Sequence, residues 1–339
     1  MPKKWKAVQS KNKAKAKTAL ALKTLFLIFV LLLIGFAVNI VKNLSQPLSY
    51  RGFDKGYIWE GDFKINLVVR NNNISVLSFD PAEQTIRIID IPDETYIEVT
   101  GGFGSWQVRS IYDLGQSERR DGATALALSL SNFLGAPIDG FIEPLNEFRQ
   151  MSAYDLVSHL RSNPLNYLQF LGNSKISLTP TEFTRLAFNV YLIRFDKITR
   201  VDLKKEALLK EKVLPDGNPG LIGDPLKIDG FASNNFIDQK LRKDEKTVAV
   251  FNASKKPGIA QKVANLISHL GGNVIFTTNA SSEIRTSLVL SNDGTISPTL
   301  IRLSQIFAPH CLKVKCAILN DPDIANSRAD INVVLGTDY

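Results

Sequence analysis

The chain has 339 residues, of which 44% are hydrophobic, and carries 41 Lys and Arg against 33 Asp and Glu, for a net charge of +8. Eight of the lysines lie within residues 1–23, which contain no acidic residue, so the rest of the chain is electrically balanced. Nucleic-acid binding needs a basic face on a folded domain. Nothing in the balanced part indicates one, and no nucleic-acid partner is expected.

Residues 24–41 follow the lysine-rich segment as an apolar run, in which the stretch 25–38 contains nothing more polar than glycine. Eighteen helical residues rise about 27 Å, close to the roughly 30 Å hydrocarbon thickness of a bilayer. The sequence predicts a cytoplasmic tail at 1–23, a single transmembrane helix at 24–41 in contact with membrane lipid, and an extracytoplasmic bulk. A cleaved signal peptide is the alternative, but the run is long for one and Ala37-Val38-Asn39 is a poor cleavage site.

An α/β pattern follows a short tether at 42–56 and extends over 57–210. Residues 63–69 and 74–79 are predicted strands joined by the turn sequence Arg70-Asn71-Asn72-Asn73. Residues 85–91 form a third predicted strand, and helices are expected at 123–134, 152–161 and 180–193. Residues 211–246 are rich in Gly, Pro and charge, and predict a linker. Residues 247–339 predict a second, smaller α/β domain with a βαβ crossover over 247–277.

The common signatures of enzymes are missing from the sequence. It contains no Gly-x-Ser-x-Gly elbow, no phosphate-binding loop, no paired-histidine metal motif and no Gly-x-Gly-x-x-Gly. No catalytic residue is therefore nominated. Cys311 and Cys316 are interpreted as structural thiols or as a local disulfide, which would need a turn between them.

Two stretches resemble known protein families. Residues 74–81, 86–90 and 91–99, with the sequence Asn132-Phe-Leu-Gly135-Ala-Pro137-Ile-Asp139-Gly-Phe141, resemble the LytR-CpsA-Psr family. Residues 248–253, 257–260, 266–271 and 334–339 resemble the LytR C-terminal domain. The resemblance implies extracytoplasmic work on the bacterial envelope. Active members of the first family move glycopolymers from a polyprenyl-pyrophosphate carrier onto peptidoglycan, using arginines and aspartate-bound magnesium beside an apolar channel.

Most of that active site does not carry over to this chain. The family's Arg-Ser-Asp-Thr falls on Arg70-Asn71-Asn72-Asn73, so that its carboxylate becomes the neutral Asn72. The family's Arg-Asp after Ile-Pro falls on Asp93-Glu94, which places an anion where a phosphate-gripping cation is required. Each lost charge-assisted bond is worth roughly 1.5–3 kcal/mol. The first domain therefore resembles a reduced member of the family.

The expected architecture is a transmembrane helix, a reduced LytR-CpsA-Psr-like α/β domain, a linker and a LytR C-terminal-like domain. The expected function is non-catalytic: an envelope protein that binds or positions cell-wall glycopolymer, or the envelope proteins that assemble it. Four arginines are candidates for anion binding: Arg70, Arg109, Arg119 and Arg120. The alternative is a transferase with a rebuilt magnesium site at Asp80, Asp93 and Glu94. No cofactor is expected otherwise.

Overall fold

The computed structural model describes residues 46–53, 55–213, 217, 219–312 and 321–339, together with residues 30, 32, 33, 39 and 44. The chain divides into the units Met1–Gln46 and Pro47–Tyr339, and nearly all described residues belong to the second. Within the described residues, no helix combines the length and the apolar character that crossing a membrane requires. The predicted basic tail and most of the predicted span at 24–41 lie outside the described residues.

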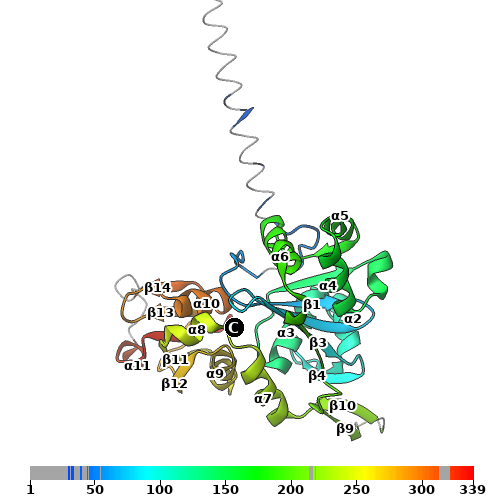
Figure 1. The fold of residues 1–339 in the computed structure, drawn as a ribbon. Coiled ribbons are helices and arrows are strands. Elements are labelled where there is room, and N and C mark those ends of the chain that lie inside the picture. The colour runs from blue at the N-terminus through cyan, green and yellow to red at the C-terminus, as the bar shows by residue number, and fades with distance from the viewer. Residues whose placement is uncertain are drawn as a thin grey trace, which may run out of the picture. The chain divides into compact units, whose positions relative to one another are not determined.

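A six-stranded sheet organises the N-terminal part of the second unit, in the order β7-β6-β1-β2-β3-β8. Figure 1 labels two of its strands, β1 and β3. Its strands are β1 (Ile65–Arg70), β2 (Ile74–Asp80), β3 (Thr85–Ile91), β6 (Gly140–Pro144), β7 (Ser174–Ile176) and β8 (Ile198–Asp202). The predicted hairpin is confirmed, because β1 pairs antiparallel with β2 from Ile65 opposite Phe79 to Arg70 opposite Ile74. Strands β6 and β8 pair in parallel with β1 and β3.

Helices cover both faces of this sheet. Side chains alternate along each strand, so Val68 and Ile89 pack into one core and Leu67 and Ile88 into the other. The first core is closed by α2 (Val108–Ser117), α3 (Gly122–Leu134) and α7 (Pro225–Asn235). The second is closed by η1 (Asn146–Gln150), α4 (Ala153–Ser162), α5 (Leu165–Gly172) and α6 (Pro180–Leu192), with η2 (Phe195–Lys197) after them.

The segment 211–246 is not a linker, which corrects the sequence prediction. A second sheet, ordered β5-β4-β10-β9, contains β4 (Thr95–Val99), β5 (Gly104–Gln107), β9 (Leu209–Val213) and β10 (Pro219–Gly223). Strand β10 pairs in parallel with β4, more than a hundred residues earlier in the chain. Helices α7 and α8 (Gln239–Asp244) then follow. Glycine and proline signalled a break in periodicity here, but the partner strand lies far away in sequence.

The C-terminal domain is a five-stranded sheet, ordered β12-β11-β15-β13-β14. Its strands are β11 (Thr247–Asn252), β12 (Asn273–Asn279), β13 (Leu288–Ser291), β14 (His310–Leu312) and β15 (Ile331–Leu335). Helices α9 (Ile259–His269) and α10 (Pro298–Ile306) cover one face, and α11 (Pro322–Ala325) lies on the other. The predicted crossover is confirmed, because β11 and β12 pair in parallel on either side of α9.

Candidate functional site

The two domains meet across a small apolar core. Phe63, just before β1, packs with Leu241 of α8 and Leu270 at the end of α9, and all three are buried. Helix α7 contacts both α3 of the first domain and α9 of the second. The segment that was expected to be a linker is therefore part of the interface.

A buried ion pair reaches across the same interface. Arg302 of α10 is 1% exposed, and its guanidinium Nη2 lies 3.0 Å from Asp139 Oδ1 and 3.2 Å from Oδ2. The guanidinium also donates to Tyr57 Oη at 2.9 Å and to the Lys64 carbonyl at 3.1 Å. Burial acts to lower the pKa of Arg302, but the Asp139 carboxylate outweighs it and the net pKa is raised. The pair is thus held in its charged form.

Two further polar contacts fix the domains to each other. The His269 ring, at the end of α9, bonds the Gly135 carbonyl at 2.8 Å and Asp229 Oδ1 at 2.9 Å. Asp238 accepts the Lys64 backbone N–H at 2.8 Å, and burial raises the pKa of that carboxyl. Together with the apolar core and the ion pair, these contacts fix the C-terminal domain against the N-terminal domain.

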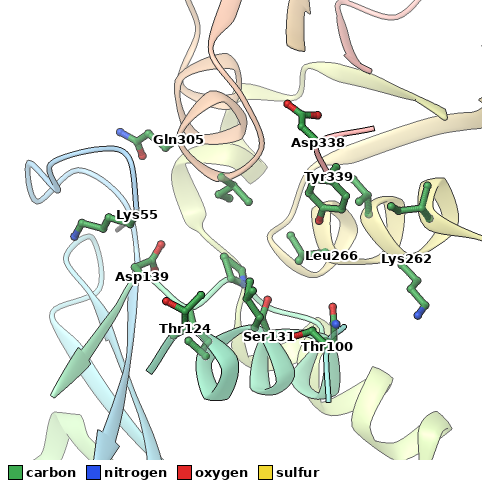
Figure 2. Close-up of a pocket in the computed structure, with 18 of the residues that line it drawn as sticks. Lys55, Thr100, Thr124, Ser131, Asp139, Lys262, Leu266, Gln305, Asp338 and Tyr339 are labelled. Carbon is green, nitrogen blue, oxygen red and sulfur yellow. The ribbon is translucent and has the colours of Figure 1, made fainter. Parts of the chain in front are cut away.

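Beside this interface lies a cavity of about 720 Å³, here called the interdomain cleft. Its first wall comes from Phe53, Lys55, Tyr57, α3 and residues 137–139, and its second from the loop before α9, α9 itself, the end of α10 and residues 338–339. Figure 2 shows Thr124 and Ser131 of α3 opposite Leu266 of α9. The volume falls within the usual 300–1,000 Å³ range of ligand sites.

Fixed positive charge in the cleft comes mainly from the C-terminal domain. Within the described part of the chain, no carboxylate pairs with Lys262, whereas Lys256 Nζ already donates to the main-chain oxygen of Tyr339, the last residue of the sequence, at 2.7 Å. Lys262 stands in the first turns of α9, where the helix dipole adds positive potential. By contrast, Lys55 is ion-paired with the buried Glu182, Nζ to Oε1 at 2.5 Å.

The acidic groups of the lining are already satisfied by the protein. Asp139 is paired with Arg302. Asp338 Oδ1 accepts the Ser287 N–H at 2.9 Å and the Ser287 hydroxyl at 2.6 Å. Arg302 neutralises Asp139, whereas Asp338 keeps its negative charge. Lys262, which has no carboxylate partner among the described residues, is therefore the cation that the lining offers to an anion, with hydroxyl and apolar groups around it.

A second cavity of about 460 Å³ continues from the cleft on the side of the first domain. The two share Thr100, Thr124 and Leu128 in their linings. Arg120 lies in the second cavity, with its guanidinium 5.0 Å from the centroid of the Phe103 ring. One of the four arginines predicted from the sequence is therefore placed at the cleft's extension.

The other three candidate arginines lie elsewhere. Arg70 is 14% exposed, ion-paired with Glu143 and Asp113, and stacked over the Tyr112 ring at 4.1 Å. Arg109 begins α2, whereas Arg119 follows its end, about 15 Å away by helical rise. The four arginines do not form one cradle, because the charge of Arg70 is compensated internally and the rest are spread along α2.

The rebuilt magnesium site of the alternative interpretation is not assembled, which corrects that prediction. Asp80 ends β2 opposite Thr85, whereas Asp93 follows the end of β3 that lies opposite Ile74. Six residues of strand separate these two ends by about 20 Å. Asp80 faces Lys64, Oδ2 to Nζ at 3.3 Å, and Glu94 lies 3.8 Å from Lys204 Nζ. Among the described residues, no group of three His, Cys, Asp or Glu could hold a metal ion.

Sequence reasoning missed the cleft because its lining is assembled from segments far apart in the chain. Lys256 and Lys262 read as ordinary surface lysines of a domain without catalytic groups. A local signal was present in Lys256-Pro257-Gly258, which places a cation beside a helix start. Gly258 adopts a φ of +77° there, in the region that favours glycine.

Of the two cysteines, Cys311 is disulfide-bonded, and Cys316 lies outside the described residues.

Residues 245–339 match the protein family described as LytR cell envelope-related transcriptional attenuator. The C-terminal segment is therefore a LytR C-terminal domain, as its motifs predicted, with its start at 245 rather than 247. No curated protein sequence matches the chain.

Several solved structures are remotely similar to the chain over about half its length. TagT of Bacillus subtilis covers 56% of this chain and 96% of its own, at 11% identity and a TM-score of 0.37. TagV of the same organism covers 62% and 98%, at 12% identity and a TM-score of 0.39. The Lin1025 protein of Listeria innocua covers 50% and 95%, at 11% identity and a TM-score of 0.38. TagT also has a structure bound to LIIa-WTA.

Proposed function

We propose that this protein is a membrane-anchored, extracytoplasmic envelope protein that binds an anionic cell-wall glycopolymer in the interdomain cleft. The observation that carries the proposal is the charge balance of that cleft. Lys262 has no carboxylate partner among the described residues, while the lining carboxylate of Asp139 is neutralised by Arg302. An entering anion therefore meets uncompensated positive charge.

The rest of the lining suits a sugar chain that carries phosphate or carboxylate groups. Thr100, Thr124 and Ser131 offer hydroxyl groups, and Leu128 and Leu266 offer apolar surface against which the C–H faces of sugar rings pack. A mixture of a few polar groups with apolar surface is typical of small-molecule sites. Arg120 in the adjoining cavity supplies a further cation along the same path, which favours an extended ligand over a compact one.

The proposal is for binding rather than transfer. The chain has Asn72 where the resembled transferases carry a carboxylate, and Asp93 where they carry an arginine. Asp80 and Asp93 stand at opposite ends of the β2–β3 hairpin. A transferase needs converging cations and a metal-binding carboxylate cluster at the reacting phosphate. This chain has arginines and carboxylates among its candidate residues, but these candidates do not converge on one point.

The location of the protein follows from the sequence. The lysine-rich residues 1–23 and the apolar residues 24–41 support a single-pass anchor with the cleft on the wall side. Carbonate extraction of membranes checks this part, because an anchored chain stays in the pellet. A mature mass about 40 residues short, expected for signal-peptide cleavage, would contradict it.

The binding proposal is tested with full-length protein in mild detergent and purified wall teichoic acid as the probe, titrated by calorimetry. The variant is Lys256→Gln combined with Lys262→Gln. Loss of two charge-assisted contacts at an exposed cleft should weaken binding about tenfold, equal to about 1.4 kcal/mol. An uncharged dextran should bind neither protein measurably.

A matched control removes the same charge elsewhere. Lys205 and Lys243 are both exposed and lie outside the cleft lining. Lys205→Gln with Lys243→Gln should leave the Kd within about twofold, because exposed and distant charges are screened at physiological salt. Equal weakening by the two double variants would mean that only net charge is sensed, and the cleft would no longer be the site.

A further inference from the structure

Helix α6 has apolar side chains on its outer face as well as on its inner one. Phe188, Tyr191 and Leu192 are 63%, 42% and 57% exposed, and Phe195 in η2 is 55% exposed. The spacing of three and four residues places Phe188, Tyr191 and Leu192 on one side of α6, and Phe195 follows after the helix has ended, with its ring 6.1 Å from that of Tyr154. These four residues are here called the outer α6 face.

The inner face of α6 packs into the core, so core packing does not explain the apolar side chains of its outer face. Phe183, Leu186 and Val190 are buried in the core shared with α4 and α5. Helix α5 lies beside α6, since the rings of Tyr167 and Phe183 are 6.2 Å apart. It adds two more exposed apolar side chains, Leu165 at 67% and Leu168 at 68%. Several large apolar side chains left exposed on two neighbouring helices are typical of a contact with a partner or a membrane.

The chain enters the second unit at this same part of the fold. The Leu48 N–H donates to the Leu178 carbonyl at 2.9 Å, and the Tyr50 N–H donates to the Ile176 carbonyl at 3.0 Å. These acceptors lie on and just after β7, between α5 and α6 in the chain. Thr179, the next residue, caps α6.

The length of chain before Leu48 limits how far this region can stand from a bilayer. The predicted span ends at residue 41, which leaves residues 42–47 to connect it to the docked segment. Six extended residues reach about 20 Å at most. That distance is comparable to the width of one headgroup region plus a layer of water, so the entry region is kept near the membrane surface.

We propose that the outer α6 face rests on the outer leaflet of the lipid bilayer in which the chain is anchored, an inference that rests on the proposed anchor at 24–41. Phenylalanine, tyrosine and leucine partition into the interfacial region of a bilayer, and tyrosine keeps its hydroxyl among the headgroups. Exposed Lys197 flanks the face and suits headgroup phosphates, whereas the neighbouring Arg194 is ion-paired with Asp196. Such a contact would fix the orientation of the interdomain cleft relative to the membrane.

The test places a fluorescent reporter on the face in the full-length protein, reconstituted into phosphatidylglycerol–phosphatidylcholine vesicles with or without brominated acyl chains. Phe188→Trp and Phe195→Trp are made separately, and the unsubstituted protein supplies the background of its native tryptophans. The matched control is Leu226→Trp, because Leu226 on α7 is 85% exposed and equally apolar. We expect brominated lipid to quench the added fluorescence at 188 and 195 and to leave that at 226 unchanged.

The remaining outcomes overturn the proposal in distinguishable ways. Added tryptophans at 188 and 195 that are quenched by aqueous iodide and not by brominated lipid would mean that the face is in water. Protection from both quenchers would mean that a second copy or another protein covers it. If carbonate removes the protein from vesicles, the anchor itself is wrong. Binding of wall teichoic acid in the cleft is measured independently, so it survives any of these results.

Discussion

Arg70 in the N-terminal domain and Lys262 in the C-terminal domain differ in whether the protein compensates their charge. In the N-terminal domain, Arg70 is held by Glu143 and Asp113 and covers the Tyr112 ring, so its charge is compensated within the fold. In the C-terminal domain, Lys262 has no carboxylate partner among the described residues and stands at the start of α9, beside a cavity. The number of cations in a domain therefore says little about anion binding. What matters is whether each cation is already ion-paired with a carboxylate of the protein.

The largest effect that would test this comparison concerns Arg302, a buried cation of the C-terminal domain. Arg302→Met leaves the Asp139 carboxylate, 3% exposed, without its counter-charge, and should lower the free energy of unfolding by about 3–5 kcal/mol. Denaturant titration of the full-length protein measures it. Arg302→Met with Asp139→Asn should recover part of the loss, whereas the exposed Arg328→Met should change stability by less than about 0.5 kcal/mol. A loss below about 1 kcal/mol for the single variant would contradict a structural ion pair.

A smaller effect separates structural from binding arginines. Arg70→Gln leaves Glu143, 5% exposed, with only Lys175 at 2.9 Å, and should cost about 1–3 kcal/mol of stability. The Kd for wall teichoic acid should stay unchanged, because Arg70 lies outside the cleft lining. Weaker polymer binding without loss of stability would reverse the roles assigned to Arg70 and Lys262.

The C-terminal domain also predicts a pH dependence. The Thr247 N–H donates to Asp330 Oδ2 at 2.9 Å and lowers the pKa of that carboxyl, with a further contribution from Lys246. A lowered pKa means that the ionised group stabilises the fold above the unfolded value of about 3.9, and that this contribution is lost as pH falls through the lower folded value. Asp330→Asn should cost up to about 1 kcal/mol at pH 7, since the group is partly exposed. The difference from the unsubstituted protein should begin to shrink in unfolding titrations as pH drops below about 4, and should vanish once the pH lies below the lower folded value. A difference that persists in acid would have another origin.

The smallest expected effect sharpens the comparison. Arg109→Gln with Arg119→Gln removes two exposed arginines that the sequence nominated and that lie outside the cleft lining. The Kd for wall teichoic acid should change by less than about twofold, against about tenfold for the double lysine variant. Calorimetry under one salt condition compares the pairs. A tenfold change for the arginines would move the binding site to α2.

Local patterns in the sequence predicted the elements that depend on local interactions. The Ala- and Leu-rich helix at 123–134 is α3, with Asp121 capping its start and Gly135, at a φ of +62°, closing it. The asparagine-rich turn after Arg70 does join two antiparallel strands. The second sheet was missed because β10 pairs with β4, and more than a hundred residues of folded chain separate these two strands in the sequence. Strand pairing of this range leaves no periodic trace in either segment.

The candidate site was harder to predict, for a related physical reason. Its lining joins residues near 55, 124, 139, 262 and 305, and only the packing of one domain against the other brings them together. The sequence located the charged residues but could not show which were already paired. Arg120 lines the cavity beside the cleft, whereas Arg70 is ion-paired with Glu143. The sequence alone does not distinguish these two arginines as candidates for anion binding.

The Arg302–Asp139 pair has a consequence for how this protein can be inherited and rebuilt. Its two halves come from different domains, and either half left alone would be an isolated charge in an apolar interior. Recombination that exchanged only one domain with that of another protein would deliver such a mismatch, and the hybrid would be selected against unless both positions travelled together. The two domains should therefore be inherited together as one unit, even where the surfaces on either side of their interface change in sequence.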